Sequence, residues 1–344
     1  MVSEVLLLSQ EDVRRCGGED MALAVETMEK VYSLHQKKDY ILPNKTVLRW
    51  GDIETENTIG RINSMPAFIG GEFNSAGIKW ISSNPQNPDK HNLPRASGLI
   101  ILNDSETFFP KAVMDAMILS AMRTGANSGV AAKYLAKKNS KVLGLIGAGV
   151  QNKTQLMAMN EVLDNLEEVK INDLNIDRAK AFAEEMSKKV NLPIKVVETA
   201  EETVRGSDVF ITATVTKEPI VKADWVSEGQ LYLHVGSHEC EFEVIDKADK
   251  IVVDDWEELK HRGVETISIM YAEGKFDENN IHAEIGEVVN SVKTGRTSDE
   301  EFIYFNSVGM GIQDVALASI IYDKAVEKNV GTKFNMFSNP VFAK

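Results

Sequence analysis

The stretch Lys141-Val-Leu-Gly-Leu-Ile-Gly147-Ala-Gly149-Val-Gln-Asn152 decides the fold class of this chain. A short apolar run, typical of a buried strand, leads directly into a Gly-Ala-Gly turn and then into a predicted helix. The first glycine allows a tight turn, the second lets the backbone approach a pyrophosphate, and the helix N-terminus supplies amide donors. Asn152 replaces the third glycine of this pattern and is expected to loosen the packing of helix on strand. Alone, the turn also fits an ordinary strand–helix connection.

The next predicted strand favours a dinucleotide-binding role for this turn. Val169-Lys-Ile-Asn-Asp173 ends in an acid 26 residues after Gly147, where a carboxylate binds the ribose hydroxyls of the adenosine. An aspartate there repels a 2′-phosphate, which favours NAD over NADP, although Asp173 could instead cap the following helix. The other residues expected to contact the cofactor lie at strand ends or at a helix start: Ala148, Gly149, Val150, Gln151, Thr212, Ala213, Thr214 and Gly236.

Short apolar strands alternate with helices from residue 142 to residue 254, and 302–305 could add a last strand. Strands this short and apolar, separated by helices, predict a parallel sheet that is buried on both faces. Helices are predicted after Ser9 and at 21–36, and between residues 40 and 103 short β-type runs alternate with turn signals, which indicates a largely antiparallel sheet. Helices are predicted at 112–119 and 125–137.

The last amphipathic helix, Asp314–Glu327, is expected to return to the first region, because the parallel sheet is complete before it. The predicted fold class is therefore α/β: a Rossmann-type doubly wound parallel-sheet domain inserted in a discontinuous α+β domain. The expected boundaries are 125–307 for the dinucleotide-binding domain and 1–124 plus 308–344 for the domain that surrounds it.

Bulk composition excludes several classes of partner. A net charge of −14 and a pI near 5.0 argue against nucleic acid and anionic membranes. Two cysteines far apart and six histidines without a His-x-x-x-His spacing predict neither disulfides nor a metal site. No signal peptide and no apolar run of spanning length is found, so a cytoplasmic protein is expected.

Four basic residues stand in contexts that are unusual for a purely structural role. Lys79 lies inside the apolar run 77–81, and Arg61 begins a predicted strand. Arg95 precedes Ala96-Ser-Gly98, and Arg123 follows an apolar helical run. Each alone could be a solvated charge. If the four converge on one cleft, they would hold a polyanionic substrate and the cofactor pyrophosphate by charge-assisted hydrogen bonds.

His238 and Glu239 follow the predicted strand 231–235, at the edge where parallel sheets bind their ligands. Histidine titrates near neutral pH without any perturbation, so it suits the proton transfer that accompanies hydride transfer. An exposed loop histidine is an equally good interpretation at this point.

Taken together, these residues resemble the ornithine cyclodeaminase/μ-crystallin family over nearly the whole chain. The matching segments are Arg61–Pro66, Gly77–Trp80, Ser97–Asp104, Met122–Thr124, Ile146–Gln151 and Gly309–Asp314. The resemblance implies a homodimer built through the sheet of the first domain and a Rossmann domain for NAD(H) or NADP(H). It also implies a substrate carboxylate held at Arg61 and Lys79, with Arg123 and Thr124 at the cofactor phosphates or the substrate carboxylate.

One departure narrows the resemblance. Cyclodeaminases of the family carry an aspartate where this chain has His238, which argues against the conversion of ornithine to proline. The chain is more similar to a subgroup that makes 2,3-diaminopropionate for siderophores and related natural products, and Glu239 falls where that subgroup has an acid. The implied reaction is NAD-dependent oxidation of N-(2-amino-2-carboxyethyl)-L-glutamate, with hydrolysis to 2-oxoglutarate and L-2,3-diaminopropionate. Three substrate carboxylates would account for the extra cations Lys79 and Arg95, and His238, Glu239 or Lys79 would be the base.

Other functions remain open on the sequence. Within the family, the chain could be another amino-acid dehydrogenase, an imine reductase, or a cyclodeaminase that works without the aspartate. A μ-crystallin-like protein would instead bind NADPH and a small hydrophobic ligand without turnover. Asp173 disfavours NADP, and several cations in one site disfavour a hydrophobic ligand.

Overall fold

The computed structural model describes residues 4–51, 58–216 and 218–338, and it divides the chain into two units. Unit 1 is the chain up to Arg123 together with the chain from Met310 onward, and unit 2 is Thr124–Gly309. The expected insertion, 125–307, differs from this division by one residue at its start and two at its end. The chain passes from unit 1 to unit 2 inside one helix, α4 (Met117–Leu135). It returns to unit 1 at the glycine turn before another helix, α12 (Gly311–Glu327).

Unit 1 is built on an eight-stranded sheet with the order β16-β1-β7-β6-β5-β4-β2, in which β3 also pairs with β4. All pairings are antiparallel except that of β1 with β7. The strands are β1 (Glu4–Leu8), β2 (Tyr40–Ile41), β3 (Thr46–Gly51), β4 (Thr58–Ile69), β5 (Ser75–Ser83), β6 (Ala96–Asn103), β7 (Pro110–Asp115) and β16 (Thr332–Asn335). The helices are α1 (Gln10–Arg15), α2 (Met21–Gln36), α3 (Asn87–His91), the first part of α4, and α12.

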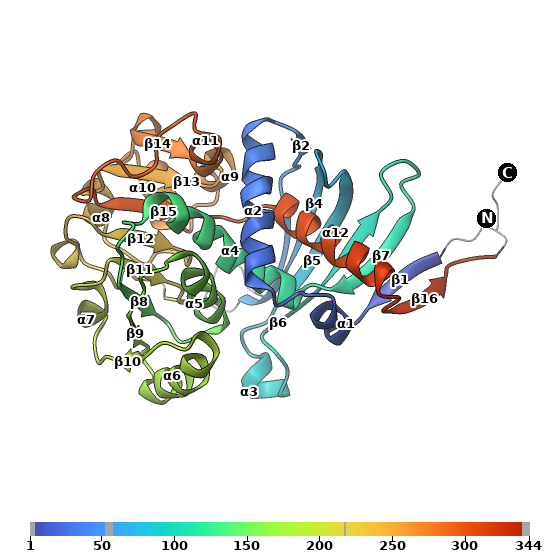
Figure 1. Ribbon diagram of the computed structural model, residues 1–344, viewed down its shortest axis with the longest axis horizontal. Coiled ribbons are helices and arrows are strands. Elements are labelled where there is room, and N and C mark those ends of the chain that lie inside the picture. Colours follow the sequence, from blue (N-terminus) through green and yellow to red (C-terminus); the bar gives the residue numbers. More distant parts are fainter. Residues whose placement is uncertain (1–3, 52–57, 217, 339–344) are drawn as a thin grey trace. The chain divides into compact units, whose positions relative to one another are not determined.

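One face of this sheet is covered by helices. α12 packs against β4, β5 and β6 and against α2, and both helices lie over the sheet in Figure 1. The strand period explains the burial, because alternate residues such as Met65, Ile100, Leu102 and Met114 point to the helices. The face that carries Lys79 is the same one, since Lys79 pairs with Met65 on β4 and Ile100 on β6.

The helix predicted at 112–119 is wrong in its first half. Residues 110–115 form β7, with alternating burial that leaves Ala112 and Met114 inside, and α4 begins only at Met117. A short apolar run cannot be assigned to helix or strand by periodicity alone, and pairing on both sides decides the matter here.

Unit 2 contains a second eight-stranded sheet, entirely parallel, with the order β10-β9-β8-β11-β12-β15-β13-β14. Its strands are β8 (Val142–Ile146), β9 (Glu168–Asn172), β10 (Ile194–Val196), β11 (Val209–Thr212), β12 (Leu231–His234), β13 (Lys250–Val253), β14 (Ile281–Glu284) and β15 (Ile303–Asn306). The α-helices are the rest of α4, α5 (Val150–Val162), α6 (Ile176–Val190), α7 (Ala200–Val204), α8 (Phe242–Asp246), α9 (Trp256–Lys260), α10 (Thr266–Ala272) and α11 (Ile285–Val289). Short 3-10 turns, η1 (Ala223–Trp225) and η2 (Glu278–Asn280), complete the unit.

The parallel sheet confirms the predicted α/β fold class. β11 and β12 are buried at every position, as expected for strands covered on both faces. β15, the last strand of unit 2 in sequence, lies between β12 and β13 and not at an edge of the sheet. In the part of the chain that the structure describes, no helix is long and apolar enough to cross a membrane.

Candidate active site

The glycine turn lies at the carboxyl end of β8. Gly147 has φ +101°, which favours glycine, and a Cβ there would lie 2.8 Å from the Ala213 carbonyl at the end of β11. Gly149 is the N-cap of α5, no side chain caps that helix, and a Cβ on Gly149 would meet nothing within 4 Å. Open space beside an uncapped helix N-terminus therefore fits the pyrophosphate of a dinucleotide.

Asn152 stabilises this turn, contrary to the expectation that it would loosen it. Its side chain is fully buried and donates from Nδ2 to the carbonyl of Ile146 at 2.9 Å and to that of Gly147 at 2.5 Å. A third glycine would have allowed a closer approach of helix and strand but could not have made these bonds. The amide thus anchors the glycine turn to the end of β8.

Asp173 lies beside the turn, just after β9. Its Oδ2 accepts from the Ala148 amide at 2.8 Å, and its Oδ1 accepts from the Asn175 amide at 2.8 Å. The helix that follows is capped by Asn175, whose side chain accepts from Asp177 and Arg178. Because Asn175 performs the capping, Asp173 is not needed for it, and its carboxylate lies at the glycine turn.

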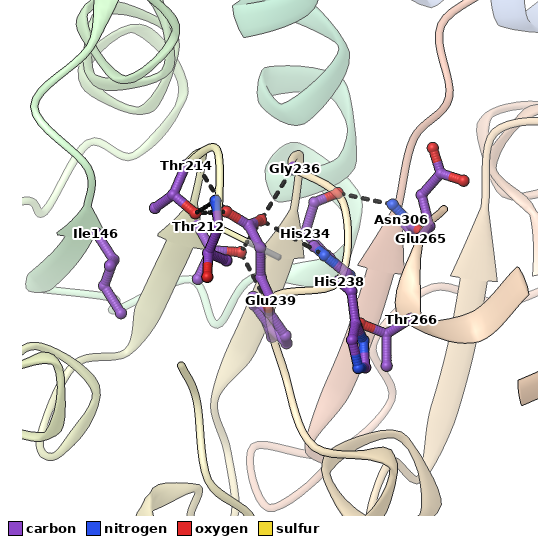
Figure 2. A network of polar contacts seen from close by, with 12 residues as sticks. Ile146, Thr212, Thr214, His234, Gly236, His238, Glu239, Glu265, Thr266 and Asn306 are labelled. Atoms are coloured by element: carbon purple, nitrogen blue, oxygen red, sulfur yellow. Dashed lines mark hydrogen bonds and ion pairs between the residues drawn. The ribbon is translucent and has the colours of Figure 1, made fainter. Parts of the chain in front are cut away.

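Glu239 joins the ends of β11 and β12 (Figure 2). It is fully buried and accepts hydrogen bonds from Thr212 Oγ1, Thr214 N and Thr214 Oγ1, each at 2.6 Å, and from Gly236 N at 2.9 Å. Three residues predicted to contact the cofactor are thereby held by one carboxylate. Burial raises the pKa of Glu239, and its hydrogen bonds with Thr212, Thr214 and Gly236 oppose that shift.

A buried histidine extends this network. His234 Nδ1 lies 2.6 Å from the Tyr304 hydroxyl, and its Nε2 lies 3.4 Å from Glu239. Burial lowers the pKa of His234 to about 3, so the ring is neutral and its approach to Glu239 is not an ion pair at neutral pH. Thr212 Oγ1 also bonds the Tyr232 hydroxyl at 2.8 Å. The strand ends are therefore fixed by buried polar side chains.

His238 is half-buried, and its Nδ1 lies 3.2 Å from the Thr266 hydroxyl (Figure 2). Burial lowers the pKa of His238, while the charge of Glu273 acts in the opposite direction. A neutral imidazole with one nitrogen oriented by a hydroxyl can accept a proton at neutral pH. His238 thus has the accessibility for proton transfer that the buried Glu239 lacks.

In unit 1, Lys79 and Arg123 meet at a residue that the sequence analysis did not select. Asp314, in the first turn of α12, is fully buried and places Oδ2 2.7 Å from Lys79 Nζ and Oδ1 3.1 Å from Arg123 Nε. Lys79 is 1% exposed, and its Nζ also lies 3.4 Å from Ser120 Oγ. Arg123 Nη1 lies 3.4 Å from Gln313 Oε1. We call Lys79, Arg123 and Asp314 the charged triad.

The other predicted residues are placed as follows. Arg61 is exposed on β4, on the same sheet face as Lys79, and pairs with Arg49 across to β3. Arg95 is exposed just before β6. Thr124 begins unit 2, where its carbonyl accepts from Gln155 Nε2 at 3.2 Å. The structure thus brings together two of the four predicted cations, Lys79 and Arg123, on one carboxylate.

The family model for the ornithine cyclodeaminase/mu-crystallin family matches residues 22–329. The chain belongs to this family. One relative is the N-((2S)-2-amino-2-carboxyethyl)-L-glutamate dehydrogenase of Staphylococcus aureus, 39% identical over 338 residues, which are 98% of this chain and 100% of the relative.

Two solved members of the family are similar over almost their full length. The Δ(1)-pyrroline-2-carboxylate reductase of Thermococcus litoralis, in complex with NADH and L-proline, is 40% identical with a TM-score of 0.88, covering 95% of this chain and 99% of the other. An archaeal alanine dehydrogenase dimer with bound NAD is 41% identical with a TM-score of 0.88, covering 97% and 100%. The predictions of an oxidoreductase and of NAD as its cofactor are confirmed at the level of the family.

Proposed function

We propose that this chain oxidises N-(2-amino-2-carboxyethyl)-L-glutamate with NAD, and that hydrolysis of the imine gives 2-oxoglutarate and L-2,3-diaminopropionate. The C–H bond at the glutamate α-carbon and the N–H bond of the secondary amine break, and a C=N bond forms. Water then adds across that bond, which separates the ketone from the primary amine. The observation that carries the proposal is the charged triad, two buried cations on one acid, in a chain similar to the Staphylococcus aureus dehydrogenase.

NAD, when bound, supplies the acceptor for the hydride. The residues proposed to hold it are those of the glycine turn and the first turn of α5, together with Asp173 and the strand-end residues bonded to Glu239. Asp173 accepts from Ala148 in this structure and has a second oxygen on Asn175, so it is already oriented at the turn. Its negative charge beside the phosphate turn favours NAD over NADP.

Lys79 and Arg123 are proposed to bind the α-carboxylate of the substrate, because they are the buried cations of unit 1 that share one acid. Arg61 is proposed to bind a second carboxylate, since it lies on the same sheet face as Lys79. Arg95 remains a candidate for the third. His238 is proposed as the base for the amine proton, and Glu239 as the residue that positions the strand ends.

We further propose a homodimer through the uncovered face of the unit 1 sheet. Trp80 and Leu99 are directly paired on this face and are 40% and 41% exposed, although both are large apolar side chains. Leu7 lies on the same face and is also exposed. A second copy would cover these side chains. The solved archaeal alanine dehydrogenase is itself a dimer.

A second candidate is oxidation of a simple amino acid or reduction of its cyclic imine. It is favoured by the similarity to the archaeal alanine dehydrogenase and to the Thermococcus litoralis reductase, and by the net charge of +1 on the triad, which matches one carboxylate. Such substrates would not need Arg61 or Arg95.

The test is a substrate comparison with purified protein and NAD. We expect NADH to form with N-(2-amino-2-carboxyethyl)-L-glutamate. Mass spectrometry should then detect 2-oxoglutarate and 2,3-diaminopropionate as the products. NADH formed only with L-alanine or L-proline would replace the proposed substrate. Conversion of ornithine to proline without net NADH would indicate a cyclodeaminase, and NADPH binding without any turnover would indicate a μ-crystallin-like binding protein.

A further inference from the structure

Asp314 lies between the two cations of the charged triad and touches both. We infer that Asp314 is a positioning residue for substrate binding: it holds Lys79 and Arg123 side by side and reduces their joint charge to +1, the complement of one carboxylate. The inference rests on the proposed function, in which these two cations bind the substrate α-carboxylate. It assigns to a residue of α12 a role that acts through Lys79 and Arg123.

The triad is assembled from three separate segments of unit 1. Lys79 comes from β5, Arg123 from α4 and Asp314 from the first turn of α12. Each oxygen of the carboxylate binds a different cation, so the ammonium and the guanidinium are held at the two ends of one rigid group. Within the residues that the structure describes, Nη2 of Arg123 makes no hydrogen bond or ion pair. We assign this nitrogen to the substrate carboxylate.

The charges of the triad explain why an acid is needed there. Two cations buried without an anion would repel each other and lack compensation for lost hydration. Burial and the charges of Arg123 and Lys45 lower the pKa of Lys79, Asp314 raises it, and the net result is a pKa of about 8. Without Asp314, Lys79 would lose its proton at a lower pH. Asp314 therefore keeps Lys79 charged near neutral pH and prevents an excess of positive charge.

A double-mutant cycle separates this role from a structural one. In Lys79→Met, the charges of Arg123 and Asp314 cancel. Binding of 2-oxoglutarate to the NADH-loaded protein should therefore weaken about tenfold or more, as measured by calorimetry. In the double variant Lys79→Met/Asp314→Asn, the net charge returns to +1 on Arg123. The gain from the restored charge should exceed the loss from a less firmly held Arg123, so this protein should bind 2-oxoglutarate more tightly than Lys79→Met alone. A merely structural Asp314 predicts the opposite, a further loss in the double variant.

The single variant Asp314→Asn gives a second readout through pH. In the wild type, KM for the substrate should rise as pH increases past about 8, where Lys79 loses its charge. In Asp314→Asn, that rise should begin at a lower pH. Asp323→Asn, an exposed acid on the same helix, should leave the KM profile unchanged. If Asp314→Asn does not fold, the cycle still decides, because the double variant removes one buried charge of each sign.

The outcomes distinguish this inference from the proposed function. Wild-type binding of 2-oxoglutarate, combined with no gain in the double variant over Lys79→Met, would overturn the role of Asp314 and leave the substrate proposal intact. Failure of the wild type to bind 2-oxoglutarate, with NADH formed from L-alanine, would overturn the substrate proposal. The same cycle run with pyruvate would then test Asp314.

Discussion

The carboxylate of Glu239 occupies the space where a side chain on Gly236 would lie, and it accepts the Gly236 amide hydrogen at 2.9 Å. The carboxylate cannot move aside without losing its bonds to Thr212 and Thr214. The backbone after β12 is therefore fitted to a buried acid on the same loop. Residue 236 has to be glycine for reasons of space, since its φ is not in the positive range that favours glycine.

Gly236→Ala should lower the free energy of unfolding by roughly 1–3 kcal/mol, because the added methyl group overlaps the buried Glu239 carboxylate. It should also raise the Kd for NAD, since Thr212 and Thr214 would shift with Glu239. Urea unfolding and fluorescence titration with NADH measure the two effects. Unchanged unfolding would show that the Glu239 side chain relaxes at little cost.

Gly149→Ala should separate cofactor binding from stability. A Cβ at Gly149 meets nothing within 4 Å, so the free energy of unfolding should change by less than about 1 kcal/mol. The methyl group would instead occupy the space proposed for the pyrophosphate, and the Kd for NAD should rise about tenfold or more. Equal NAD affinity in the variant and the wild type would place the pyrophosphate elsewhere.

Asp173→Ser should change cofactor preference. Removal of the carboxylate would remove the proposed repulsion of a 2′-phosphate and the proposed hydrogen bonds to the ribose, so the kcat/KM ratio of NADP to NAD should increase about tenfold or more. Asp177→Ser, an exposed acid in the first turn of α6, is the matched control and should leave the ratio unchanged. If Asp173→Ser leaves the ratio unchanged, another residue binds the ribose hydroxyls.

His238→Asn should reduce kcat about 100-fold or more if His238 accepts the amine proton. Burial lowers the pKa of His238, so kcat/KM of the wild type should rise with pH through a value below the ordinary 6.5 and then level off. The exposed His261→Asn serves as control. If kcat/KM of His238→Asn still rises with pH over the same range, the rise belongs to the titration of another group.

Asp254→Asn tests a buried acid in unit 2 that accepts from the amides of Val308, Gly309 and Asp255. Burial raises the pKa of Asp254 to about 6 from an ordinary 3.8, so its contribution to stability is greatest at low pH and falls as pH rises from about 4 to 6. The stability difference between wild type and variant should therefore shrink over that range by roughly 3 kcal/mol. Urea unfolding at pH 4, 5, 6 and 7 measures it, and a constant difference would contradict the shift.

The features that sequence could predict are those set by local pattern. The parallel sheet, the glycine turn and Asp173 follow from apolar runs, glycines and one acid at a fixed distance along the chain. β7 was misassigned because Lys111-Ala-Val-Met-Asp115 is too short for its period to be read, and only pairing with β1 and β6 defines it.

Long-range partnerships could not be predicted in the same way. Asp314 lies in an apolar helix, and nothing near it in sequence indicates that it meets Lys79, 235 residues away. Gln313-Asp314 after a Gly-Met-Gly turn was the available signal, because adjacent polar residues in a helix of otherwise buried positions call for partners. The prediction for Asn152 was wrong for a related reason. It considered the volume of the side chain and not the hydrogen bonds that its amide donates to two backbone carbonyls.

The arrangement of the unit 1 sheet has a consequence for synthesis on the ribosome. β1, near the start of the chain, pairs with β7 on one side and with β16 on the other, and the triad is incomplete until α12 supplies Asp314. Unit 2 is one continuous segment and can fold as soon as it has emerged. The early strands of unit 1 stay without these partners until α12 and β16 have been translated, so the charged triad forms only after unit 2 has emerged.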